Sequence, residues 1–191
     1  MKLFEYQGKK LFVKYDITVP NGKLVTKEKD FSDLKFPLVL KAQVPIGGRG
    51  KAGGIKTCKN SKDAKEKLSE IMGMNIRGYK VGKILAEEMA IIKKELYISI
   101  SIDRTKRMPL IIASASGGMD IESVSDNRIF KEWVNPLIGI QSFNLRNIIS
   151  KLKLEKEEAK KISSVISKIY KLFREYDCEL VEINPLIVTK K

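Results

Sequence analysis

Apolar and polar positions along the chain follow the two periods that distinguish helices from strands. Residues 155–176 place apolar side chains three or four positions apart, which predicts a long helix with one buried face. Residues 95–104 alternate with period two, which predicts a half-buried strand. Further helices are expected at 3–15, 61–72 and 143–152, and further strands at 37–45, 54–58, 81–86, 109–114 and 179–188. Helices and strands therefore mix along the chain, and an α/β or α+β fold is expected.

Three local signals define the ends of these elements. Ser61 precedes a helical pattern and is expected to cap that helix. The segment Val19-Pro-Asn-Gly22 is typical of a turn. The short segment 105–107 separates two predicted strands and indicates a hairpin.

The composition is that of a folded protein. The chain has 191 residues, of which 43% are apolar, enough for one sizeable domain or two small lobes. No apolar stretch approaches the roughly 18 residues of a membrane span, and no signal peptide is recognisable. Cys58 and Cys178 lie far apart without metal-ligand spacing, which is typical of reduced cysteines. A cytoplasmic protein without membrane contact is expected.

The net charge of +14, from 37 Lys and Arg against 23 Asp and Glu, raises the question of a nucleic-acid partner. A nucleic-acid surface typically interleaves basic side chains with aromatic stacking platforms. Here the lysines are scattered over the predicted helices, so a solvated lysine-rich surface is favoured and no nucleic-acid partner is expected. The positive charge would also attract an anionic nucleotide.

The chain contains no histidine. It therefore cannot supply a histidine base, a histidine metal ligand or a phosphohistidine. Hydrolytic triads of the Ser-His-Asp type are excluded.

A glycine-rich loop follows the strand predicted at 37–45. The segment Lys41-Ala-Gln-Val-Pro-Ile-Gly-Gly-Arg-Gly-Lys-Ala-Gly-Gly54 combines glycines with three cations. Glycines let backbone N–H groups converge on an anion, and the cations add fixed positive charge, so the loop suits a polyphosphate. It matches neither a Walker A loop nor GxGxxG. On local chemistry alone, a flexible hairpin tip with solvated cations stays an alternative.

Four segments, in order, resemble a known family. They read EYQGKKLF, LKAQV…GGRGKAGG, KELYISISIDR and EINPLIVT, and they extend from Met1 to about Thr189. In these segments the chain resembles the beta subunit of succinyl-CoA synthetase, whose N-terminal half is an ATP-grasp domain. The resemblance implies an ATP-grasp fold of two lobes, with mixed or antiparallel sheets flanked by helices. It places residues 1–20 and 95–191 in a core lobe, and 21–94 in a smaller lobe that closes on nucleotide.

The resemblance also assigns the nucleotide-binding residues. They are Lys41, Gly48, Arg49, Gly50, Glu87, Ala90 and Glu95. Lys41 and the glycine loop would bind phosphates, and the positions from Glu87 to Glu95 would contact the base and ribose. Ordinary surface acids are the alternative for Glu87 and Glu95. Pro20 matches a position where ATP-using members carry proline, which favours ATP over GTP.

Glu182 and Asn184 alternate along the last predicted strand, so two oxygen-bearing side chains would share one face. Such oxygens suit Mg²⁺. On the residues alone, an exposed strand face that ends at Pro185 is favoured instead. By resemblance, Asn184 is a magnesium ligand and Glu182 is the catalytic acid that faces the phosphohistidine loop of an alpha subunit. Ser116 departs from the family, in which many members carry glutamate, so this position keeps its hydrogen-bonding capacity and loses its charge.

The resemblance implies an ADP-forming ligase subunit of the tricarboxylic acid cycle. With ATP and Mg²⁺ as cofactors, it would transfer phosphate to a histidine on an alpha subunit that carries the CoA site, in a heterodimer. The sequence ends at Lys191, before the family's second magnesium ligand, so these residues alone are expected to bind nucleotide without completing the reaction. A stand-alone nucleotide-binding or regulatory module, or a relative acting on malate, acetate or citrate, stays an alternative.

Overall fold

The structure, a computed structural model, describes residues 1–190 and divides into two compact units. The first unit consists of residues 1–14 and 18–90, and the second of residues 15–17 and those from 91 onward. The expected lobes differ from these two units mainly in residues 1–14, which were expected in the same lobe as residues 95–191. These residues group with the first unit because helix α1 (Glu5–Lys14) is bonded to it by side chains such as that of Gln43, which accepts a hydrogen bond from the N–H of Tyr6 (3.1 Å).

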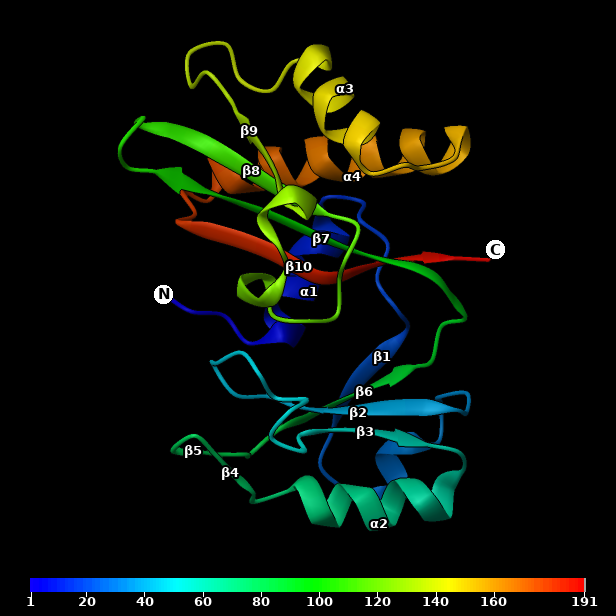
Figure 1. The fold of residues 1–191 in the computed structure, drawn as a ribbon. Helices are drawn as coiled ribbons and strands as arrows, with labels where there is room; N and C mark the ends of the chain where they lie inside the picture. Colours follow the sequence, from blue (N-terminus) through cyan, green and yellow to red (C-terminus); the bar gives the residue numbers. More distant parts are fainter. Residues whose placement is uncertain (191) are drawn as a thin grey trace. The chain divides into compact units, whose positions relative to one another are not determined.

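The first unit is built on an antiparallel sheet of four strands in the order β1-β6-β2-β3 (Figure 1). Its strands are β1 (Gly22–Val25), β2 (Leu38–Ala42), β3 (Ile55–Cys58) and β6 (Ile84–Glu88). A 3-10 helix η1 (Glu28–Phe31), helix α2 (Ser61–Ile71) and a hairpin of β4 (Asn75–Ile76) and β5 (Tyr79–Lys80) complete the unit. The central strands β2 and β6 therefore have hydrogen-bonded neighbours on both sides.

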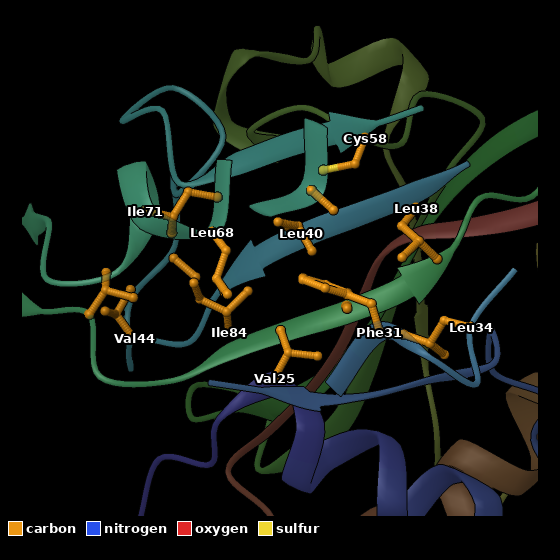
Figure 2. Packing of buried hydrophobic residues seen from close by; sticks show 14 of the residues in the cluster. Val25, Phe31, Leu34, Leu38, Leu40, Val44, Cys58, Leu68, Ile71 and Ile84 are labelled. Atoms are coloured by element: carbon orange, nitrogen blue, oxygen red, sulfur yellow. The ribbon is translucent and has the colours of Figure 1, made fainter. Parts of the chain in front are cut away.

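Helix α2 closes the core of the first unit. Its Ala64, Leu68 and Ile71 are buried, at the three- and four-residue spacing of one helix face. Figure 2 shows Leu68 and Ile71 pointing toward Leu40 and Ile84 of the sheet. The cap of this helix is Asn60 and not Ser61 as expected, because the Asn60 side chain accepts a hydrogen bond from the N–H of Asp63 (3.0 Å).

The second unit contains another antiparallel sheet of four strands, in the order β10-β7-β8-β9. Its strands are β7 (Ile92–Asp103), β8 (Met108–Ser114), β9 (Phe130–Trp133) and β10 (Leu180–Thr189). The helices are α3 (Ser142–Lys151), α4 (Lys156–Glu175) and the short 3-10 helices η2 (Ile121–Ser123) and η3 (Asp126–Arg128). The expected hairpin between β7 and β8 is confirmed, since Asp103 pairs with Met108.

Helix α4 packs against β7 and β10 with the apolar face that the sequence predicts. Ile162, Ile166 and Ile169 of this face are all nearly inaccessible to solvent. The antiparallel sheets and flanking helices of the two units confirm the expected α+β class. Within the described residues, no helix is both long and apolar enough to cross a membrane.

Candidate functional site

Lys41 lies in β2 with its ammonium directed at two carboxylates. Its Nζ donates to Glu87 Oε2 of β6 (2.5 Å) and to Glu5 Oε1 of α1 (3.1 Å). Glu87 is only 2% exposed, so protein groups and not water surround its carboxylate. The pairing of β2 with β6 brings the two side chains together, because Val39 and Lys41 lie opposite Glu87 and Leu85.

Two more cations join this group, which we call the Lys41 cluster: Lys9, Lys41, Arg49, Glu5 and Glu87. Lys9 forms ion pairs with Glu87 and, at 2.9 Å, with Glu5. Arg49 Nη2 lies 2.7 Å from Glu5 Oε2. Three cations against two carboxylates leave the cluster with one net positive charge.

Opposing effects act on the protonation of the two residues at the centre of the cluster. Burial alone would raise the pKa of Glu5, but Lys41, Lys9 and Arg49 outweigh it and lower that pKa well below its usual value. Burial would lower the pKa of Lys41, but Glu5 and Glu87 raise it. Glu5 is therefore ionised and Lys41 protonated at neutral pH.

The glycine loop, residues 47–54, is closed on itself by backbone hydrogen bonds. The N–H of Gly54 donates to the carbonyl of Arg49 (2.8 Å), and the N–H of Ala52 donates to that of Gly48 (3.2 Å). Gly48 has a φ of 73°, which favours glycine. The N–H groups of Gly48, Arg49 and Gly50 take no part in the backbone-to-backbone bonds of the described residues, so they are available to an anion.

Arg49 ties the glycine loop to the rest of the first unit. Besides its ion pair with Glu5, its Nη1 donates to the carbonyl of Ala42 at the end of β2 (2.9 Å). The structure thus brings together the predicted residues Lys41, Gly48, Arg49, Gly50 and Glu87. Ala90 follows β6 and is the last residue of the first unit, and its expected role stays a prediction.

The carboxylate of Glu87, which was expected to contact the base or ribose, is already bound by two lysines. Both carboxylate oxygens accept bonds from cations, Oε1 from Lys9 and Oε2 from Lys41. Glu87 is therefore placed to fix the two ammonium groups, and direct contact with a nucleotide stays a prediction.

Glu95 lies in the second unit, beside a shallow pocket of about 490 Å³ lined by residues 92–95 and 115–117. The carbonyl of Glu95 accepts from the N–H of Gly117 (3.0 Å). A Cβ on Gly117 would stand 2.5 Å from the carbonyl oxygen of Leu96, so only glycine fits there. Ser116 Oγ is buried and has no hydrogen-bond partner in the described chain.

Two lysines of this pocket are fixed by helix α4. Lys94 Nζ lies 2.6 Å from Glu158 Oε2, and Lys93 Nζ lies 2.9 Å from Glu158 Oε1. Hydrogen bonds from Lys94, Lys93 and the N–H of Glu155 lower the pKa of Glu158 to about 2. Much of the positive charge on the two lysines is therefore balanced within the unit.

Asn184 holds the loop that follows β8. Its Oδ1 accepts from the N–H of Gly118 (2.7 Å), and its Nδ2 donates to the carbonyl of Met119 (2.9 Å). An amide oxygen has two lone pairs, so one remains for a cation. Among the described residues, no three His, Cys, Asp or Glu side chains gather into a metal cluster. Asn184 fits a Mg²⁺ that is held largely by phosphate and water oxygens.

Glu182, two residues before Asn184, accepts a hydrogen bond from the hydroxyl of Tyr97 on β7 (3.0 Å). Burial, together with Glu182, raises the pKa of Tyr97 to about 12, so the phenol stays protonated and keeps donating. Glu182 itself is exposed. The structure therefore orients this carboxylate without enclosing it.

Sequence reasoning did not identify Glu5, Lys9 or Tyr97 as parts of these sites. Glu5 and Lys9 lie four positions apart in α1, a spacing that brings two side chains together on one helix face. That i,i+4 pair was visible in the sequence. Its contact with Lys41 was not, because it arises only when α1 packs against the first unit.

Comparison with known proteins identifies both a family and a set of relatives. The sequence model of the ATP-grasp domain family matches residues 2–188. The beta subunit of the ADP-forming succinate–CoA ligase of Methanocaldococcus jannaschii is 45% identical over the whole chain, which covers 54% of that protein. The corresponding subunit of Desulfotalea psychrophila is 42% identical, with 53% of it covered. The chain thus spans about half the length of these relatives.

Solved structures agree on the fold. An ATP citrate lyase from Methanothrix soehngenii, in complex with citrate and coenzyme A, matches 98% of this chain with a TM-score of 0.77 and 25% identity; 47% of that chain is covered. A dinucleotide-forming acetyl-coenzyme A synthetase from Ca. Korarchaeum cryptofilum matches with a TM-score of 0.80 and 20% identity. The match covers all of this chain and 88% of the synthetase chain. Since the family model covers almost all of its residues, this chain belongs to the ATP-grasp family.

Proposed function

We propose that this chain is the ATP-binding part of a succinate–CoA ligase beta subunit. The observation that carries the proposal is the 45% and 42% identity, over the whole chain, to beta subunits named as ADP-forming succinate–CoA ligases. The words "ADP-forming" in those names, together with Pro20, favour an adenine nucleotide.

The Lys41 cluster and the glycine loop would bind the phosphates. Lys41 and Arg49 have fixed positions before any ligand arrives, because Glu5 and Glu87 hold them. The free N–H groups of residues 48–50 add donors without adding a mobile side chain. In phosphoryl transfer the protein mainly positions groups and stabilises charge, and a preorganised cluster with net positive charge suits that task.

In the second unit, Asn184 would supply an amide oxygen to Mg²⁺, and Glu95 a carboxylate that can accept from ribose hydroxyls. Bound magnesium would neutralise charge that develops on the phosphate oxygens. Asn184 is oriented for this by its two bonds to the loop at Gly118 and Met119.

The phosphate acceptor would lie on another chain. This chain has no histidine, and its relatives are named as one subunit of an enzyme, which implies a partner. We propose that the partner is an alpha subunit with a phosphohistidine and the CoA site. Glu182, exposed and oriented by Tyr97, would face that histidine.

A second candidate acid substrate is citrate, which is present with coenzyme A in the structure of the ATP citrate lyase from Methanothrix soehngenii. If citrate is the substrate, the nucleotide chemistry is the same and only the carboxylic acid differs. A nucleotide-binding module without catalysis is the third candidate. Nucleotide binding is common to all three, so it should be tested first.

Isothermal titration calorimetry of the 191-residue chain with ATP, ADP and GTP tests nucleotide binding. The expected result is binding of ATP and ADP, with GTP weaker. A chain that binds none of the three would exclude every candidate above.

Transfer of label from γ-labelled ATP then tests the role of the chain. The chain is mixed with the alpha subunit of an ADP-forming succinate–CoA ligase, and acid-labile label is expected on the alpha subunit alone. Label on this chain without the partner would contradict the proposed division of roles. Addition of coenzyme A with either succinate or citrate then shows which acid discharges the label.

A further inference from the structure

The hairpin of β4 and β5 has an unusual residue at its tip. Asn75 pairs with Lys80 and Ile76 with Tyr79, so Arg77 and Gly78 alone form the turn. Arg77 has a φ of 48° and Gly78 a φ of 90°. Two-residue turns of this kind favour asparagine, aspartate or glycine at the first position, because the left-handed conformation is costly for other side chains. The left-handed conformation of Arg77 therefore costs free energy that asparagine or glycine at this position would avoid.

The hairpin is fastened to the glycine loop. Ile76 is 1% exposed, and a Cβ on Gly54 would stand 2.6 Å from its Cδ1. At the base of the hairpin, the N–H of Val81 donates to the carbonyl of Met74 (2.8 Å). These contacts fix the tip of the hairpin with respect to the loop.

The side chain of Arg77 lies against Gly48. If Gly48 carried a Cβ, that atom would be 3.0 Å from Nη2 of Arg77, 3.3 Å from Cζ and 3.5 Å from Nη1. The guanidinium group therefore covers the Cα of Gly48. The N–H of Gly48, like those of Arg49 and Gly50, takes no part in the backbone-to-backbone bonds of the described residues.

Arg77 and Arg49 differ in how their charges are balanced. Arg49 is paired with Glu5 and with the carbonyl of Ala42. The Arg77 side chain forms no hydrogen bond and no ion pair within the part of the chain that the structure describes. A cation without a counter-ion thus lies beside N–H groups that also present positive charge. Arg77 is exposed, so water screens the repulsion between the two features, and an anion that lies between them would be attracted by both.

We propose that Arg77 is a phosphate-contacting residue that donates to the nucleotide bound by residues 48–50. The inference rests on the proposed nucleotide binding and adds a cation from a hairpin that the family resemblance did not point to. A guanidinium offers paired donors that match phosphate oxygens, which a lysine at the same place would not reproduce.

The test compares three variants of the 191-residue chain. Arg77→Asn removes the cation and introduces a side chain that tolerates left-handed backbone. Arg77→Lys keeps the charge but not the paired donors. Lys80→Ala removes a charge of the same sign from the same hairpin, on the exposed strand β5, and serves as the control. Each variant is titrated with ATP and with adenosine, and its melting temperature is recorded.

We expect Arg77→Asn to weaken ATP binding about tenfold, because a charge-assisted contact is lost, while the melting temperature stays equal or rises. Arg77→Lys should recover only part of the affinity, and adenosine binding should not change. A purely structural role would instead lower the melting temperature and weaken both ligands together.

Two results would overturn the inference. If the unmodified chain binds ATP and Arg77→Asn binds it as Lys80→Ala does, Arg77 makes no phosphate contact and the proposed function stands. If the unmodified chain binds no nucleotide, the proposed function and the inference both fail.

Discussion

The ammonium of Lys41 and the carboxylate of Glu87 lie 2.5 Å apart although 46 positions separate them in the sequence. One is at the end of β2 and the other near the end of β6, and the pairing of these central strands brings the charges together. The glycine loop begins a few residues after Lys41. The sheet therefore fixes a cation beside the loop before any anion arrives.

Lys41→Ala should weaken ATP binding about tenfold or more, since the loss of charge-assisted contacts costs about 1.5–3 kcal/mol. Calorimetric titration measures the effect. Lys62→Ala, on the exposed side of α2, removes one charge without contact to the cluster and is the matched control. Equal affinities of the two variants for ATP would contradict a phosphate contact by Lys41.

Glu87→Gln should lower the free energy of unfolding by about 3 kcal/mol, the lower end for a broken buried ion pair, because Lys41 keeps Glu5 as a partner. Urea denaturation measures this difference. Glu66→Gln on the exposed face of α2 should change stability by less than about 0.5 kcal/mol. A Glu87→Gln variant as stable as Glu66→Gln would show that the cluster does not stabilise the first unit.

Two neighbouring glycines of the loop should respond differently to alanine. In Gly48→Ala, the alanine would have to adopt a φ of 73°, and its Cβ would lie against the guanidinium of Arg77. This substitution should lower the free energy of unfolding by at least about 1–2 kcal/mol. At Gly47 a Cβ would meet nothing within 4 Å, so Gly47→Ala should leave stability nearly unchanged. Denaturation of both variants, followed by ATP titration, checks the difference, and the reverse order of stability would refute the described loop conformation.

Glu158 should make the second unit sensitive to acid. Its pKa is about 2 in the folded protein against an ordinary value of 4.5, so below pH 4.5 the unfolded chain binds a proton that the folded chain does not. The stabilisation is present above pH 4.5 and is lost as the pH falls toward 2. Melting temperatures between pH 5 and pH 2 should fall less steeply for Glu158→Gln than for the exposed control Glu157→Gln. Parallel curves would exclude this contribution.

Sequence patterns predicted the long elements because their periodicity extends over many residues. The apolar face of α4 and the strand at residues 95–104 were both visible, and the structure confirms both elements. The half-buried character expected from the alternation is wrong, because residues 96–100 of β7 are buried without a break, on both faces of the strand. The hairpin at residues 75–80 was missed because two-residue strands show no period and its turn, Arg77-Gly78, lacks the usual Asn or Asp. β1 was missed because its first residue, Gly22, was assigned to a turn.

The candidate site was predictable where glycine and charge coincide, as in the loop after Lys41. The partners of Lys41 were not predictable from local chemistry. Glu5 lies 36 positions away and Glu87 lies 46 positions away, so their roles follow from how α1 packs and which strands pair. The same holds for Asn184, whose amide bonds join it to residues 65 and 66 positions earlier.

The place of β10 in its sheet has a consequence for the order in which the chain can fold. β7 lies between β8 and β10, and β10 is the last strand in the sequence. During synthesis, β8 can pair with β7 at once, while the other edge of this isoleucine-rich strand keeps its backbone groups unpaired until residues 180–189 have left the ribosome. Such an edge is prone to pair with other chains. While residues 115–179 are synthesised, β7 therefore has an unpaired edge that can bind other chains. The loop at Gly118 can form its hydrogen bond with Asn184 only after β10 has been synthesised.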